Sequence, residues 1–145
     1  MAEQIRWSAL INSSWTELGD TAERALAEEN FHIQHGLSLL RRLLSSDEGH
    51  KRLEPVVLEL VPHGREYFVD CDLGLVDNGV LTMSMADQEQ MWIDQVTETF
   101  NEFNISVDIS QEAQGMGRSG IRSNDFATLH DEMVAVIQID PKAKW

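Results

Sequence analysis

Residues 55–72 have the sequence PVVLELVPHGREYFVDCD, and this stretch decides the predicted fold class. Because a proline interrupts helical hydrogen bonding, we expect the preceding helix to end before Pro55. The aliphatic, β-branched run that follows is typical of a buried strand. After the Pro-His-Gly turn signal at residues 62–64, residues 66–72 alternate apolar and polar side chains, which is the period of a half-buried strand. Two strands joined by a short turn are therefore predicted here.

Further strands are predicted downstream of this stretch. The sequence Asp-Asn-Gly at residues 77–79 is a tight-turn signature that favours positive φ. Apolar and polar residues then alternate over residues 80–85 and again over residues 105–109. The apolar residues 133–139 predict a last strand, preceded by a short helix at residues 125–131. The sheet would thus contain about five strands.

Helices are predicted before the sheet and within it. Residues 14–46 have helical periodicity, with Ser14 as N-cap and Glu17 completing a capping box. A weak break at residues 29–30 divides this segment into a helical hairpin. Residues 87–103 form the clearest amphipathic helix of the chain. Its apolar stripe consists of Trp92, Ile93, Val96, Phe100 and Phe103.

The predicted architecture is a single α+β domain over residues 1–145. Residues 1–50 form a helical front. Residues 51–145 form a mostly antiparallel sheet, which the helix at residues 87–103 covers on one face because an isolated sheet needs a cover.

Composition excludes several classes of protein. The chain has 145 residues, 42% of them hydrophobic, and no apolar run approaches the roughly 20 residues of a membrane helix. No secretory signal is visible, and the single cysteine, Cys71, rules out an internal disulfide framework. A pI of about 4.5 argues against binding nucleic acid through a basic surface. We therefore expect a cytoplasmic protein that binds neither membranes nor nucleic acid.

The acidic charge is concentrated in one part of the chain. The formal net charge is −14, and the stretch between Glu66 and Gly117 holds 11 acidic residues and no basic one. Within it, Asp94, Glu98 and Glu102 follow one another at four-residue spacing, so they form one row on the predicted helix. Carboxylates so placed must face water, bases from elsewhere in the chain, a metal or a basic partner.

This pattern favours a non-enzymatic module that covers a basic surface of a partner protein, as immunity proteins, DNA mimics and secretion chaperones do. It would be an inhibitor from a bacterium or a phage. Trp7, Trp92 and Trp145 are candidate anchors, although Trp92 is expected in the core. The sequence also allows the chain to form a homodimer. The predicted partner-binding face consists of Asp70, Asp72, Asp77, Asp87, Asp94, Glu98 and Glu102.

No catalytic motif, metal site or cofactor site is predicted, but an alternative remains open. Asp70 and Asp72 would project to one face of a strand and could share a divalent cation, although the spacing of an EF-hand loop is absent. His32 and His35 share a helical face. An enzyme or ligand-binding domain without a local motif would use these aspartates and the histidines.

Residues 115–120 match G-x-G-x-x-G, but neither a preceding strand nor a following helix supports a nucleotide site. We predict a flexible loop there, containing Gly115, Gly117, Arg118 and Gly120. A second alternative function is a structural subunit of a larger phage or secretion assembly, in which exposed apolar residues would contact neighbouring subunits.

Overall fold

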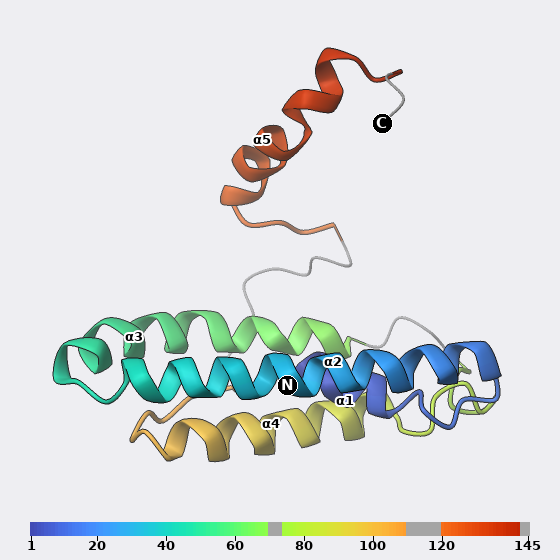
Figure 1. Cartoon of the computed structure of the whole chain (residues 1–145), viewed down its shortest axis with the longest axis horizontal. Coiled ribbons are helices and arrows are strands. Elements are labelled where there is room, and N and C mark those ends of the chain that lie inside the picture. The colour runs from blue at the N-terminus through green and yellow to red at the C-terminus, as the bar shows by residue number, and fades with distance from the viewer. Residues whose placement is uncertain (70–73, 110–119, 143–145) are drawn as a thin grey trace.

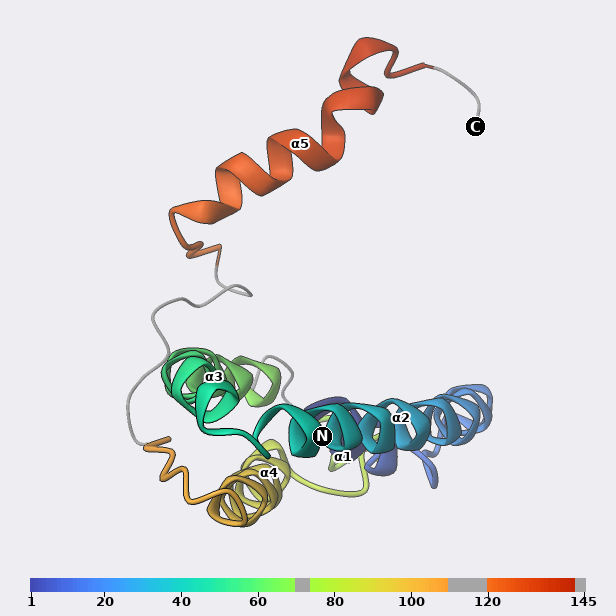
Figure 2. The ribbon, with the colours of Figure 1, turned by 60° about the vertical axis from the view of Figure 1, so that its left-hand side comes forward.

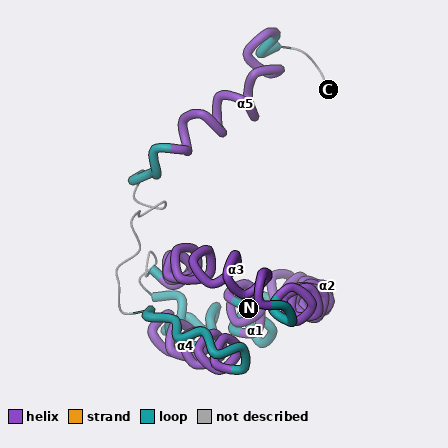
Figure 3. The backbone as a smooth tube through the Cα atoms, turned by 90° about the vertical axis from the view of Figure 1, so that its left-hand side faces the viewer, coloured by secondary structure: helices purple, strands orange, loops and turns teal. Residues whose placement is uncertain are grey.

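The computed structural model describes residues 1–69, 74–109 and 120–142, and this part of the chain is helical throughout, without a strand (Figure 3). The predicted α+β class is therefore wrong. The elements are α1 (Ala2–Ser8), α2 (Thr16–Leu43), α3 (Asp47–Leu60), the 3₁₀ helix η1 (Val61–Phe68), α4 (Met85–Asn101) and α5 (Asp125–Ile139).

Helix α2 is one continuous helix of 28 residues, not a hairpin. The expected break at residues 29–30 does not occur, because neither Glu29 nor Asn30 prevents helical geometry as proline would. The predicted cap is also wrong. The N-cap is Trp15, and the Ser14 hydroxyl instead donates a hydrogen bond of 2.8 Å to the Asn78 carbonyl.

Helix α3 contains residues 56–60 of the predicted first strand, and the last residue of that strand, Val61, begins η1. Ser46 caps it by accepting a hydrogen bond of 3.1 Å from the Gly49 amide, and the helix then runs through Pro55 to Leu60. A short apolar run such as residues 56–61 fits a buried strand and a helix equally well, so periodicity alone could not decide. In α3 the helix is already capped by Ser46 and two turns long before Pro55, and it continues through the proline to Leu60.

The other predicted strands are absent from the described residues too. Residues 66–68 belong to η1, residues 80–84 form irregular structure, and residues 105–109 have no strand partner. The turn at residues 77–79 is confirmed, with Gly79 at φ 69°, but it does not join two strands. Alternation at residues 105–109 arises because Ile105 and Ile109 are both buried in the helical core.

Helix α4 confirms the predicted amphipathic helix, and Trp92 lies in the core as expected, only 4% exposed. Its apolar side packs against α1, η1 and the segment after α4. The main core cluster consists of Ile5, Phe68, Trp92, Val96 and Ile109. A second, smaller cluster of Ala9, Leu81 and Met85 lies beneath the end of α1.

Helices α2, α3 and α4 run side by side, with the short α1 packed against α2 and α4 (Figures 1 and 2). The long helix α2 has only two buried residues, Gly19 and Ala22, and Gly19 lies against the backbone of Leu10 and Ile11, just after α1. Helix α5, which includes the predicted last strand at residues 133–139, buries none of its residues. The fold therefore leaves long helical surfaces exposed.

Candidate functional site

The acidic row on α4 is built as the sequence predicts. Asp94, Glu98 and Glu102 are all exposed on the side of α4 that faces away from the core residues Trp92 and Val96. Glu102 lies 3.8 Å from Arg41 of α2, and Asp94 accepts a hydrogen bond of 2.8 Å from Gln90. The row is thus open to solvent over most of its length, and whether it binds a partner stays a prediction.

Asp87 has a local structural role. Its amide donates to the Ser84 hydroxyl over 3.1 Å, and that hydroxyl in turn donates to the Asp87 carboxylate over 2.6 Å. This exchange caps the N-terminus of α4, where a carboxylate also interacts favourably with the helix dipole. Asp87 lies at the opposite end of α4 from Glu102, so it extends the acidic row along the whole helix.

The remaining predicted site residues are divided between described and undescribed parts of the chain. Asp77 is exposed in its turn, and Gly120 adopts positive φ at 81°. The other predicted residues lie outside the part of the chain that the structure describes, so the predictions made for them stay predictions. They are Asp70, Cys71, Asp72, Gly115, Gly117, Arg118 and Trp145.

The histidines are not gathered at one place. His32 Nδ1 lies 3.2 Å from Glu29 Oε1 one turn earlier on α2, and the His32 side chain is 64% exposed. His50 Nε2 lies 2.9 Å from the Phe103 carbonyl, where it links α3 to the end of α4. Over residues 1–69, 74–109 and 120–142, no three His, Cys, Asp or Glu side chains come close enough together to hold a metal ion.

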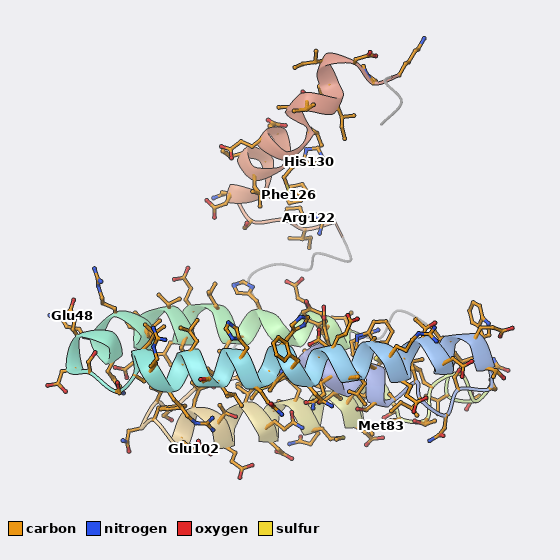
Figure 4. All side chains as sticks on the ribbon, in the orientation of Figure 1. Glu48, Met83, Glu102, Arg122, Phe126 and His130 are labelled. Atoms are coloured by element: carbon orange, nitrogen blue, oxygen red, sulfur yellow. The ribbon has the colours of Figure 1, made fainter. Side chains whose placement is uncertain are left out.

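Sequence reasoning missed the apolar surface of α5, because its residues were assigned to a strand. Large apolar side chains recur there at alternating spacings of three and four residues, and Met133 is 72% exposed. We call this stripe the α5 seam; it consists of Phe126, Leu129, Met133 and Val136. Phe126 and His130 lie near each other on α5 (Figure 4). Their rings are stacked, with the ring centroids 5.5 Å apart. The seven-residue repeat was the signal that could have revealed it.

A second exposed stripe runs along α2. It contains Gly36, at which an added Cβ would meet nothing within 4 Å, and Leu39, which is 44% exposed. We call it the α2 seam; it consists of His32, Gly36, Leu39 and Leu43. Two side chains of α2 contact neighbouring elements through polar groups: Asn30 accepts a hydrogen bond from Gln4 of α1, and Arg41 pairs with Glu102 at the C-terminal end of α4. Both lie about half a helical turn away from the α2 seam.

None of the helices in the described ranges has both the length and the apolar content needed to span a bilayer. No curated protein matches the chain in sequence. A family model, described as "Phenylacetic acid catabolic protein", matches residues 1–145. This match points to a metabolic role, so the predicted inhibitor of the immunity-protein, DNA-mimic or chaperone type is wrong. The chain belongs to the phenylacetic acid catabolic protein family.

Proposed function

We propose that this chain acts in the catabolism of phenylacetic acid as a helical subunit that binds other protein chains. The observation that carries the proposal is the family match, which extends over residues 1–145 and so includes every helix of the fold. The pathway follows from the family's name. The role as a binding subunit is supported by the exposed surfaces of α2, α4 and α5.

The exposed apolar side chains support binding to protein. Folded chains that work alone seldom leave contiguous apolar stripes uncovered, because such stripes promote association. Helix α5 exposes its whole seam, and Leu39 and Leu43 are exposed on α2. Both surfaces lie on regular helices, which present side chains in fixed positions and are therefore suited to a specific interface.

The acidic row on α4 supports a basic partner. The excess of 11 acidic residues between Glu66 and Gly117 creates a negative field that would speed the encounter with a positively charged protein. Asp94 and Glu98 pair with no basic side chain in the described part of the chain, so they are available to bases on that partner. We place this partner in the same catabolic pathway, and the whole assembly in the cytoplasm.

Deleting the gene in its source organism tests the proposal. We expect the deletion strain to lose growth on phenylacetic acid as sole carbon source and to keep growth on succinate, which enters metabolism by another route. A plasmid copy of the full chain should restore growth. Unchanged growth of the deletion strain on phenylacetic acid, in an organism with no second copy of the gene, would contradict the proposed function.

A further inference from the structure

The turn at residues 74–79 is closed by hydrogen bonds from both residues of its asparagine–glycine pair. The side-chain amide of Asn78 donates a hydrogen bond of 2.8 Å to the Gly74 carbonyl, and the Gly79 amide donates one of 2.9 Å to the Val76 carbonyl. Asn78 and Gly79 are exposed at the end of the turn, and Gly79 has φ 69°. The turn therefore presents this pair to water.

The same turn fixes the start of α2. Ser14 directly precedes Trp15, the N-cap of that helix. The Ser14 amide donates a hydrogen bond of 2.8 Å to the Gly79 carbonyl, and the Ser14 hydroxyl donates one of 2.8 Å to the Asn78 carbonyl. The position of the first turn of α2 therefore depends on where the backbone carbonyls of Asn78 and Gly79 lie.

An asparagine followed by glycine can react within its own chain. The backbone nitrogen of the glycine attacks the side-chain carbonyl carbon of the asparagine, and the new C–N bond closes a five-membered succinimide ring. The side-chain nitrogen takes up the glycine's amide proton and leaves as ammonia. Water then opens the ring at either carbonyl, which gives aspartate or isoaspartate. The reaction needs only water, and glycine favours it because no Cβ hinders the attacking nitrogen. Asn78 is the only asparagine of the sequence that a glycine follows.

We propose that Asn78 is a site of spontaneous deamidation, and that its conversion releases the start of α2 from the turn. In the isoaspartyl product the backbone runs through the former side chain, so it gains one methylene before Gly79, and the former Asn78 carbonyl becomes a free carboxylate. Both carbonyls that accept hydrogen bonds from Ser14 are thereby displaced. In either product the amide that donated to the Gly74 carbonyl is lost, and a new negative charge lies beside that oxygen and beside Asp77.

The fold sets the rate of this conversion. The ring closes only when the Asn78 side chain leaves the Gly74 carbonyl and the Gly79 nitrogen leaves the Val76 carbonyl, so the reaction proceeds from an opened turn. The hydroxyl of Ser14 contributes one of the hydrogen bonds that keep the turn closed. Ser14→Ala should therefore raise the rate of conversion about fivefold, which is the effect of one ordinary hydrogen bond on an equilibrium.

Peptide mapping by mass spectrometry follows the conversion in the full chain, incubated at neutral pH and physiological temperature. The peptide with Asn78 should gain the mass difference between an NH₂ and an OH group and separate into aspartyl and isoaspartyl forms. It should do so before the peptide with Asn12, which is also exposed in a turn but precedes serine. Thr21→Ala is the matched control for Ser14→Ala, because it removes a hydroxyl that bonds to Glu17 within α2, and it should leave the rate unchanged.

Two outcomes of this experiment would overturn the proposal. One is an Asn78 that stays intact in the folded chain while it converts in the chain unfolded by urea. The other is the same rate of conversion in the natural chain and in Ser14→Ala, because the turn would then not be coupled to the start of α2.

Hydrogen exchange tests whether conversion releases α2. The Ser14 amide should exchange faster in the converted chain, because its acceptor, the Gly79 carbonyl, has moved. The Thr82 amide, which bonds to the Ala9 carbonyl outside the turn, is the internal control and should keep its protection. In Asn78→Gln the longer side chain closes a six-membered ring far more slowly, so the Ser14 amide should stay protected throughout the incubation. Equal exchange of that amide before and after conversion would overturn the release of α2. Neither measurement depends on growth, so this inference can fail while the proposed function stands.

Discussion

At the scale of single residues, the contact between Gly64 and Trp92 fixes how η1 packs on α4. A Cβ added at Gly64 would overlap Trp92 Cζ2, and the indole Cε2 and Cη2 atoms lie 3.1 Å from it. Trp92 is only 4% exposed and belongs to the main core cluster, so it has little freedom to move. We therefore expect Gly64→Ala to lower the free energy of unfolding by about 1–3 kcal/mol.

Urea unfolding followed by tryptophan fluorescence measures this change. The matched control is Gly36→Ala, another glycine-to-alanine change within a helix, at a site with nothing within 4 Å. There the added methyl group should raise the free energy of unfolding of the chain by about 0.5–1 kcal/mol, because alanine favours helix more than glycine does. Equal effects of the two substitutions would show that η1 does not pack tightly on Trp92.

At the scale of secondary-structure elements, Pro55 inside α3 costs stability. Proline has no amide hydrogen to donate to the Lys51 carbonyl, and its ring crowds that carbonyl. Pro55 itself is exposed, so no core contact depends on its ring. Pro55→Ala should therefore raise the free energy of unfolding by about 1–3 kcal/mol.

Thermal unfolding followed by circular dichroism at 222 nm checks this prediction. Glu59→Ala, an exposed substitution on the same helix, is the control and should change stability by less than about 0.5 kcal/mol. A decrease in stability for Pro55→Ala would mean that the proline shapes a bend on which the packing of α3 depends.

The same elements explain which parts of the fold the sequence could predict. The pattern of α4 was decisive because its apolar residues recur over four turns and Ser84 caps its start. Residues 56–61 and 133–139 are short apolar runs without such length, and a helix and a buried strand then look alike. The acidic row could be placed because it depended only on the α4 pattern. The α5 seam could not be predicted, because residues 133–139 were expected to form a strand, in which residues three and four apart do not share a face.

At the scale of the whole molecule, the acidic row should matter for function and little for stability. Replacing Asp94, Glu98 and Glu102 by their amides removes two like-charge neighbours, each worth about 0.2–0.5 kcal/mol, and one exposed ion pair of similar strength. The melting temperature should therefore change little. Complementation of growth on phenylacetic acid should fall, because the row would no longer attract a basic partner.

The matched control removes three exposed acids from α2, as Glu17→Gln, Asp20→Asn and Glu23→Gln. It changes the net charge by the same amount and should leave complementation intact. Loss of complementation in both variants would mean that total charge, and not the row on α4, is what the cell requires.

Salt tests the association with a basic partner at the scale of the whole molecule. The chain carries a formal charge of −14, and Asp94 and Glu98 on α4 are exposed and make no ion pair with a basic side chain of the described residues. Attraction between such charges and a basic protein is screened over the roughly 8 Å Debye length of physiological salt. The affinity for the basic partner, measured by isothermal titration calorimetry, should therefore fall as salt is raised. An affinity that stays the same at high salt would show that the exposed apolar side chains, and not the acidic row, hold the partner.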